Sequence, residues 1–345
     1  MFSFRTTPLS EQLDRALRDG RTAVMESPGA WDAAQRRYSS EIFAARGNLV
    51  RVEDWNDSRF LATLDAIVVD VLDTGSRYGR DLSALIGLMN VLHTLESDDE
   101  NGYDLPSLYI VDHPNPAGRI VEGSMPPGSG KHLRCAHRHG LTIGELARLH
   151  YADIGAKYAL HIISAAASAN THLLMPWAIP AQEDVAGFFT SQMLAGHYLW
   201  RFTNVTPATG TTRPYEMFGA PWISHADGQV PCPPGAAMRP CTFVPWSGPY
   251  AGQTCRGWQT ILFPGEEYHS LLHAVELMRH LAERYSEFRF EPELWDTLAD
   301  PVIEAYLRGS ISLDIVQESI KAEEQKWIRK AKRFCLYDDP PFRIK

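Results

Sequence analysis

The first half of the chain alternates short runs of aliphatic and β-branched residues with longer segments of helical periodicity. The runs predict strands at 22–25, 49–52, 66–71 and 108–111, and the longer segments predict helices at 31–46 and 82–95. Alternation of this kind is typical of a parallel sheet covered by helices on both faces. We therefore expect a Rossmann-like α/β domain, whose ligand site lies beyond the carboxyl ends of the strands.

The second half has a different texture and is expected to form a smaller α+β domain. Loops rich in proline and glycine occupy residues 207–252, between short apolar segments. Two helices are expected after them, one at 266–285 and a heavily charged one at 313–334. Because 345 residues suffice for about two domains, we place them at 1–165 and 166–345 with a cleft between them.

Composition disfavours several classes of protein. The formal net charge of −9 argues against a nucleic-acid partner, because phosphate contacts need a basic surface. No apolar run approaches the ~20 residues of a membrane-spanning helix, so no membrane association is expected. The polar N-terminus lacks the apolar core of a secretion signal, which predicts a cytoplasmic location. The five cysteines are odd in number and scattered, which disfavours a disulfide framework.

Titratable side chains follow two of the predicted strands. Asp70 and Asp73 come at the end of the third strand, and Asp112 and His113 at the end of the fourth. Because the carboxyl ends of parallel strands meet at one edge of a sheet, these groups are expected where ligand chemistry takes place. The alternative for Asp70 and Asp112 is that they cap a helix or brace a loop.

Motifs for cofactors and metals fail on spacing. The segment 123–132 lacks the first glycine of a phosphate loop, and no G-x-G-x-x-G follows the first strand, so no cofactor is expected. Four potential metal ligands lie close together in the chain: His132, Cys135, His137 and His139. Arginines at positions 134 and 138 interleave with them and would repel a cation, so no metal is expected. Arg138 and His139 are instead expected to face the cleft.

Residues 209–222, TGTTRPYEMFGAPW, combine hydroxyl groups with Arg213 and Glu216 ahead of an aromatic turn. The guanidinium of Arg213 can hold a carboxylate through two parallel hydrogen bonds. It can equally pair with Glu216 and brace the loop. The residues alone leave both roles open.

Four ordered segments carry a resemblance to a known family. They are DHPNPAGRIVEG at 112–123, RHGLTIGELA at 138–147, TNVTPATGTTRPYEMFGAPWI at 203–223 and YAGQTCRGWQ at 250–259. From about residue 20 onward the chain resembles the NamZ-type exo-β-N-acetylmuramidases. That family removes terminal N-acetylmuramic acid from peptidoglycan fragments. Its Rossmann-like N-terminal domain and smaller C-terminal domain agree with the layout expected above.

The resemblance implies a set of site residues. Positions that match the family's motifs are Asp70, Asp73, Gly75, Arg77, Asp112, Asn115, Glu122, Arg138, His139, Thr142, Glu145, Asn204, Thr211, Thr212, Arg213 and Glu216. The lactyl carboxylate of muramic acid would suit Arg213 or Arg138. Its hydroxyl and acetamido groups would suit Asn115, Asn204 and the two threonines. We therefore expect Arg138, Asn115 and Arg213 to converge on one cavity, with Arg77 and Glu216 in the same substrate-binding set.

The chain departs from the family where carboxylates are expected. The family's P-E-H-G segment, whose glutamate is the natural proton donor, is replaced by LVRVEDW, with Glu53 nearby. Arg201 and Pro207 stand where the E-G-T-N-x-S-E-G segment has acids. The other replaced positions are Glu26, Ser27 and Pro28 for T-N-P, Glu183 and Asp184 in place of P-S-P-N, and Tyr78, Gly79, Arg80 and Asp81 for an aromatic run.

The leading hypothesis is a glycosidase-like enzyme that acts on an N-acetylmuramyl or related carboxylated sugar. Glycoside hydrolysis normally uses two carboxyl groups, one of them as proton donor. The candidate catalytic residues are Asp70, Asp73, Glu53, Glu183 and His139, with Glu26 as a further candidate for the lost acid.

Two alternatives stay open. The pocket could instead catalyse proton transfer, isomerisation, elimination or cyclisation on a carboxylated small molecule of specialised metabolism. It could also bind a sugar without catalysis. The partner is a small molecule in every case, and the sequence leaves open whether two chains form a homodimer.

Overall fold

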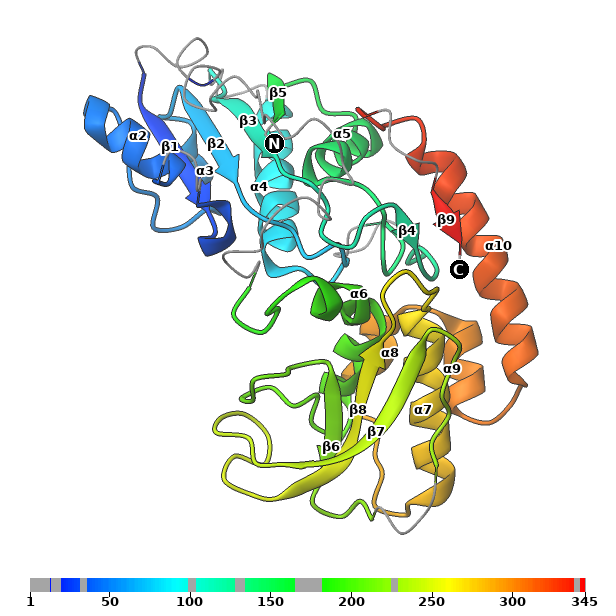
Figure 1. Cartoon of the computed structure of the whole chain (residues 1–345). Helices are drawn as coiled ribbons and strands as arrows, with labels where there is room; N and C mark the ends of the chain where they lie inside the picture. The colour runs from blue at the N-terminus through cyan, green and yellow to red at the C-terminus, as the bar shows by residue number, and fades with distance from the viewer. Residues whose placement is uncertain are drawn as a thin grey trace.

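A four-stranded parallel sheet forms the first domain, in the upper part of Figure 1. The computed structural model describes residues 13, 20–31, 36–98, 104–127, 134–164, 182–224, 229–337 and 342–344. The strands are β1 (Thr22–Glu26), β2 (Ala66–Asp70), β3 (Ser107–Asp112) and β5 (Leu160–Ser164), in the spatial order β1-β2-β3-β5. All neighbouring strands are parallel, which confirms the predicted Rossmann-like domain.

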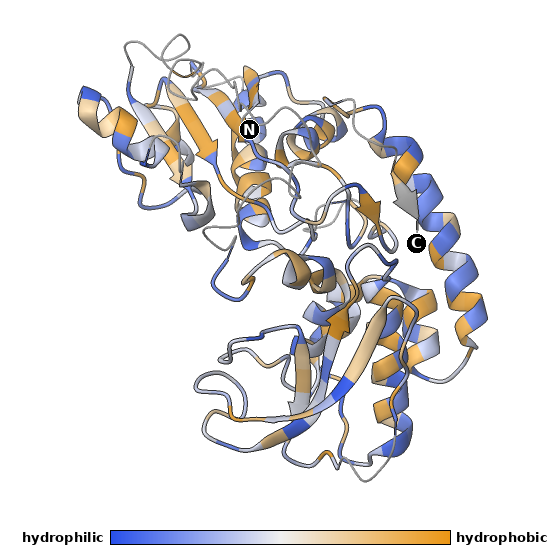
Figure 2. Cartoon of the chain, in the orientation of Figure 1, coloured by the Kyte–Doolittle hydropathy of each residue, from blue (hydrophilic) through white to orange (hydrophobic). Residues whose placement is uncertain are grey.

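Helices cover both faces of this sheet because the central strands are apolar on both sides. β2 is buried along its whole length, and it is coloured as hydrophobic in Figure 2. Val68 and Val111 pack on one face with Phe43 of α2 (Ser39–Arg46). On the other face, Ile67 and Ile110 belong to the cluster that also includes residues of α4 (Arg80–Glu96) and α5 (Ile143–Ile154).

Two predicted elements are shorter in the structure. Of the helix predicted at 31–46, residues 32–35 lie outside the described part, and α2 begins only at Ser39 because Arg36 has a left-handed backbone with φ of 57°. The strand predicted at 49–52 is wrong beyond Leu49, which alone forms a bridge to Thr22. The chain then turns through Asp54 toward the short helix α3 (Ser58–Leu61).

The second domain combines helices with an antiparallel sheet, as predicted for an α+β domain. Its sheet has the order β6-β8-β7, formed by β6 (Met217–Ala220), β7 (Ala236–Phe243) and β8 (Cys255–Leu262). Its helices are α6 (Phe188–His197), the 3-10 helix η3 (Tyr198–Phe202), α7 (Ser270–Arg284), α8 (Glu293–Leu298) and α9 (Pro301–Leu307). Helix α7 matches the prediction at 266–285 within four residues.

The last long helix, α10 (Leu313–Ala331), runs from the second domain back to the first (Figure 1). Val316 and Ile320 pack in the core of the second domain, whereas Trp327 and Ile328 pack in the core of the first. Beyond it, β9 (Arg343–Ile344) pairs with β4 (Ile120–Val121) of the first domain. The C-terminal segment therefore contributes to both domains.

The predicted domain boundary at 165/166 falls in residues 165–181, outside the described part, and stays a prediction. Among the described helices, none has both the length and the apolar composition needed to cross a membrane.

Candidate active site

Three titratable side chains lie on one face of the sheet where the strands end. β1 and β2 pair Glu26 with Asp70, and β2 and β3 pair Asp70 with Val111, so His113 follows two residues further on the same face. This is the α2 face, which carries Val68 and Val111. The strands end on the side of the sheet that faces the second domain (Figure 1).

Asp70 lies at the centre of this group and contacts its neighbours directly. Its Oδ2 accepts a 2.5 Å hydrogen bond from the Ser39 hydroxyl, and its Oδ1 lies 2.6 Å from His113 Nε2. The Asp70 side chain is 1% exposed and that of His113 16%. Because Asp70 is enclosed and occupied, it is suited to orient His113 rather than to reach a substrate.

Glu26 is held by the first turn of α2. The Ser40 hydroxyl donates to Oε1 at 2.5 Å and the Ser40 amide to Oε2 at 3.1 Å. Ser39 and Ser40 open the helix, so its first turn lies over the strand ends. Two adjacent serines therefore bind the acids of two adjacent strands.

Asp73 and His139, two of the candidate catalytic residues, form a buried pair. His139 Nε2 lies 3.0 Å from Asp73 Oδ2, and the two side chains are 0% and 4% exposed, respectively. Asp73 also accepts a bond from the Gly75 amide, where the backbone is left-handed with φ of 80°. The expectation that His139 faces the cleft is wrong, because its side chain is fully buried. Its carbonyl oxygen accepts a hydrogen bond from Trp327 of α10.

Arg138 is also enclosed, and its expected role in substrate binding stays a prediction. It is 0% exposed and pairs with Glu122 at 2.9 Å. Glu122 in turn lies 3.6 Å from His269, and His269 bridges to Glu324 of α10. Burial by itself would raise the pKa of Glu122, but the charges of His269 and Arg138 outweigh it and lower that pKa. This network joins the domains in the protein interior.

Arg77 joins the domains in a second way. Its guanidinium donates to the carbonyl oxygens of Ser124, Thr297 and Leu298, and the last two are at the C-terminus of α8. Arg77 lines a pocket of about 300 Å³ between α4 and the second domain, together with Tyr78. Because its Nη1 and Nη2 atoms donate to main-chain oxygens of both domains, Arg77 links the domains, and its expected substrate contact stays a prediction.

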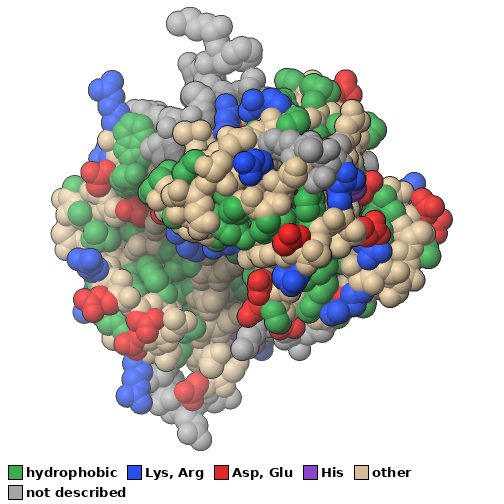
Figure 3. Space-filling view, turned by 90° about the horizontal axis from the view of Figure 1, so that it is seen from below, with side chains coloured by type: hydrophobic (Ala, Val, Ile, Leu, Met, Phe, Trp, Pro, Cys, Tyr) green, Lys and Arg blue, Asp and Glu red, His purple; other side chains and the backbone are tan. Residues whose placement is uncertain are grey.

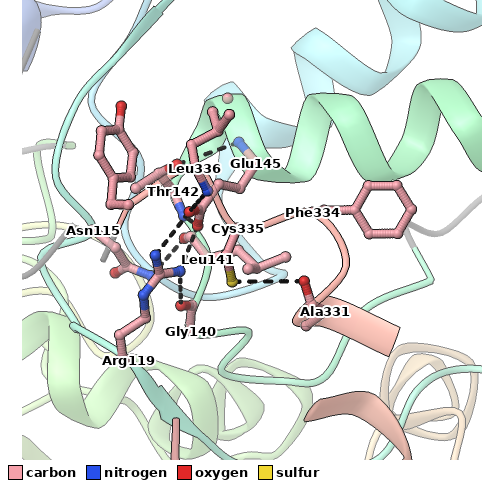
Figure 4. Close-up of polar contacts among 12 residues, drawn as sticks. Asn115, Arg119, Gly140, Leu141, Thr142, Glu145, Ala331, Phe334, Cys335 and Leu336 are labelled. Carbon is pink, nitrogen blue, oxygen red and sulfur yellow. Dashed lines mark hydrogen bonds and ion pairs between the residues drawn. The ribbon is translucent and has the colours of Figure 1, made fainter. Parts of the chain in front are cut away.

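Asn115 and Asp112 brace the start of α5. The Asn115 amide donates to Leu141 O at 2.7 Å, and its oxygen accepts from the Ala117 amide. Asp112 accepts bonds from the Thr142 hydroxyl and the Gly144 amide, and burial raises its pKa to about 6. Figure 4 shows Asn115 beside Thr142 in this network of polar contacts. The helix-capping alternative is therefore correct for Asp112.

The same network holds Arg119 against Glu145. The Nη1 and Nη2 atoms of Arg119 donate to the Glu145 carboxylate, at 2.5 and 2.7 Å, and Nη1 also donates to Gly140 O. Figure 4 shows the Arg119 guanidinium between Gly140 and Glu145. Glu145 completes the cap of α5 by accepting from the Thr142 amide. The segment at 138–147 thus builds the scaffold under the strand ends.

The segment around Arg213 carries an accessible cation. The Arg213 side chain is 56% exposed, and its Nη1 lies 3.0 Å from Glu216 Oε2. The other Glu216 oxygen accepts from the Thr190 hydroxyl at 2.7 Å. Thr211 forms a turn by donating to Ala208 O, whereas Thr212 is exposed. The loop-bracing pair therefore exists, and it leaves the guanidinium of Arg213 accessible.

The buried side chain of His197 holds the backbone of the segment that carries Arg213. His197 Nδ1 donates to Tyr215 O at 2.7 Å, where the Tyr215 backbone has a φ of 61°. His197 Nε2 contacts the Tyr268 hydroxyl, which also contacts His273 Nδ1, both at 2.9 Å. Burial lowers the pKa of His197 to about 3 and that of His273 to about 4. Both rings are therefore neutral at physiological pH.

Asn204 does not reach this segment. Its side-chain amide donates to Glu287 O and its oxygen accepts from the Arg289 amide, so it fastens the chain beside residues 287–289. The expected contact of Asn204 with substrate stays a prediction. The expectation that Arg138, Asn115 and Arg213 share a cavity is wrong, because the first two are enclosed in the first domain and Arg213 is exposed in the second.

Several residues at which the chain departs from the family motifs contact other side chains between the two domains. Arg80 Nη1 lies 3.3 Å from Glu183 Oε2, and these side chains are 58% and 77% exposed. Tyr78 stacks on Tyr198 at 4.6 Å between ring centroids, and Arg201 donates to the Tyr215 hydroxyl at 3.1 Å. Viewed from below, the surface is hollowed between two lobes (Figure 3). Glu53 is exposed in the turn before α3.

Two family models match the chain in order. The model described as "Exo-beta-N-acetylmuramidase NamZ, N-terminal" matches residues 47–180, and "Exo-beta-N-acetylmuramidase NamZ, C-terminal" matches residues 194–337. The chain belongs to the NamZ exo-β-N-acetylmuramidase family. NamZ is a hydrolase family, so the NamZ assignment gives the chain a glycosidase-like function at family level.

Relatives agree with the NamZ assignment. The peptidoglycan β-N-acetylmuramidase NamZ of Bacillus subtilis (strain 168) is 22% identical over 298 residues, covering 80% of this chain and 68% of that protein. Two crystal structures of DUF1343 family proteins from Bacteroides fragilis NCTC 9343 share the fold. Their TM-scores are 0.74 and 0.78, with identities of 16% and 15%. Each comparison covers 96% of this chain, and 98% and 97% of the respective structures.

The NamZ motifs did not reveal every residue of this site. Ser39, Ser40 and Thr190 were missed, because a single hydroxyl carries no sequence signal until the strand ends are placed. The pairing of His113 with Asp70 could have been predicted. Asp70 comes two residues after Val68 and His113 two residues after Val111, and these valines lie on the same face of two neighbouring strands. The possible metal ligand His132 lies outside the described residues, among which no group of three or more ligand-type side chains could hold a metal.

Proposed function

We propose that the protein is a glycosidase that releases a terminal N-acetylmuramyl or related carboxylated sugar from a glycan fragment. The observation that carries the proposal is the ordered match of both NamZ models, which together extend over both domains. The curated relative that matches most of the chain is a peptidoglycan β-N-acetylmuramidase. The two alternatives, other chemistry on a carboxylated small molecule and binding without catalysis, receive no support from these matches.

Arg213 is proposed to bind the lactyl carboxylate of the sugar. Its side chain is 56% exposed, and Glu216 and Thr190 fix the base of the loop that carries it. Charge-assisted bonds from a guanidinium to a carboxylate are among the stronger polar contacts. The exposed hydroxyl of Thr212 is next to Arg213 and is proposed to contact the sugar. Asp70 is proposed as the buried carboxylate that orients the reacting groups, and Glu183 and Glu53 are exposed carboxylates.

The test is turnover of an aryl β-N-acetylmuramide. We expect release of the aryl alcohol together with N-acetylmuramic acid, and much weaker release from the matched N-acetylglucosaminide, which lacks the lactyl carboxylate. Folded protein that binds N-acetylmuramic acid and leaves both glycosides intact would refute the proposed hydrolysis. Equal rates on the two glycosides would refute the role of the carboxylate.

A further inference from the structure

His113 is a group that can transfer protons, and it is present although the chain lacks the P-E-H-G segment of the family. His113 Nε2 lies 2.6 Å from Asp70 Oδ1, and a second bond from the Ser39 hydroxyl fixes the opposite oxygen of the same carboxylate. An ionised Asp70 accepts the proton on Nε2, which leaves the lone pair of the imidazole on Nδ1. A buried carboxylate that fixes a histidine in this manner also stabilises the imidazolium formed when the ring takes up a proton.

Glu26 provides the second group on the other side of Asp70. The strand register places Glu26 directly beside Asp70, and His113 contacts Asp70 from the opposite neighbour. With strands about 4.8 Å apart, the backbones that carry Glu26 and His113 are roughly 10 Å apart. The three side chains share one sheet face, so Glu26 and His113 flank a central buried acid. Both are partly exposed, whereas Asp70 is not.

We propose that His113 and Glu26 are the acid-base pair of the NamZ-type reaction in this chain, with Asp70 as the positioning residue between them. This rests on the proposed glycosidase function. His113 accepts a proton from the water whose oxygen bonds to the anomeric carbon. Glu26, in its protonated form, transfers its proton to the glycosidic oxygen as the bond from that oxygen to the anomeric carbon breaks and its electron pair moves to the oxygen. Exchange with solvent then removes the proton from His113 and returns one to Glu26.

Geometry favours this pair over the other candidates. Asp73 and His139 are enclosed, and Asp112 is committed to the cap of α5. Glu183 is 77% exposed and pairs with Arg80, which is itself 58% exposed, whereas Glu26 receives two hydrogen bonds from Ser40. Positioned acids and bases contribute about 10²- to 10⁴-fold to a rate.

The experiment compares two substrates that differ in leaving group. An aryl β-N-acetylmuramide has a leaving group that departs without a proton, whereas a disaccharide with non-reducing N-acetylmuramic acid needs one. We expect Glu26→Gln to lower kcat on the disaccharide about 10²-fold or more and to change the aryl glycoside little. His113→Gln, which preserves a donor to Asp70, should lower kcat on both. Imidazole added to His113→Ala should restore part of the activity.

Asp70→Asn tests the positioning role through kcat rather than KM. It should lower kcat on both substrates with little change in KM, because Asp70 has no access to the sugar. The matched control is His161→Gln, since His161 is an exposed histidine on β5 of the same sheet that stacks on Tyr109. This control should behave as the wild type.

Full activity of His113→Gln on both substrates would overturn the proposal, as would equal losses for Glu26→Gln on the two substrates. Urea unfolding of each variant shows that it is folded before its rate is interpreted. If the wild type itself turns over neither substrate, the proposed function fails. A wild type that is active while these variants remain active refutes the acid-base pair alone.

Discussion

Acid should destabilise this protein through the two buried histidines that contact Tyr268. Burial lowers the pKa of His273 from 6.5 to about 4, so the folded ring stays neutral down to that pH. The unfolded chain takes up a proton as the pH falls through 6.5, and stability is lost from there downward. Each unit of pH between the two values costs about 1.4 kcal/mol. From pH 7 to 4.5, His273 should therefore remove about 2–3 kcal/mol from the free energy of unfolding.

The measurement is urea unfolding at several pH values between 7 and 4.5, followed by tryptophan fluorescence. His273→Gln should flatten the pH dependence by about 2–3 kcal/mol across that range, because glutamine has no proton to gain. His197→Gln should do so by a similar amount, since the pKa of His197 is lowered to about 3. The exposed His161→Gln controls for loss of any histidine. If His273→Gln retains the wild-type slope, His273 is not held neutral by burial and the reasoning fails.

Four further predictions concern packing and substrate contact. Trp327→Phe should cost about 1–3 kcal/mol in urea unfolding, because it leaves the buried carbonyl of His139 without its 2.8 Å donor. Gly87→Ala should raise the melting temperature, since the new methyl group meets nothing within 4 Å and alanine gains about 0.5–1 kcal/mol in a helix. Gly196→Ala should lower it, because the methyl carbon would lie 2.0 Å from the backbone of α7. Arg213→Ala should raise KM for the muramide about 10-fold or more while KM for the matched glucosaminide stays unchanged, which initial-rate kinetics would show.

Hydrophobic patterning predicted the architecture well, because it reports directly on burial. Aliphatic runs predicted the strands that carry Ile67 and Ile110. The helix predicted to end at residue 46 does end there, before Gly47, whose left-handed φ of 77° suits a helix terminus. The pattern gave a wrong strand at 49–52. Two aliphatic residues followed by turn residues are also compatible with a segment that touches the edge of the sheet through a single bridge, as Leu49 does.

The site was harder to predict because a motif residue does not reveal what it contacts. Arg138 and Asn115 match family segments equally well whether they bind a sugar or brace a loop, and the structure assigns both to internal contacts. Local sequence cannot show that α8 approaches Arg77, or that α10 approaches His139, from far along the chain. The charge of Arg213 could be assigned to an accessible surface only once the loop and its Glu216 partner were placed.

The path of α10 has a consequence for folding during synthesis. Trp327 and Ile328 belong to the core that surrounds the first sheet, and the strand pair β4 and β9 closes the same domain. Most of that domain leaves the ribosome early, yet these pieces emerge only after the whole second domain has been made. Until α10 and β9 have been synthesised, the first domain therefore exposes the apolar surface that they later cover. Exposed surface of this kind is a binding site for chaperones.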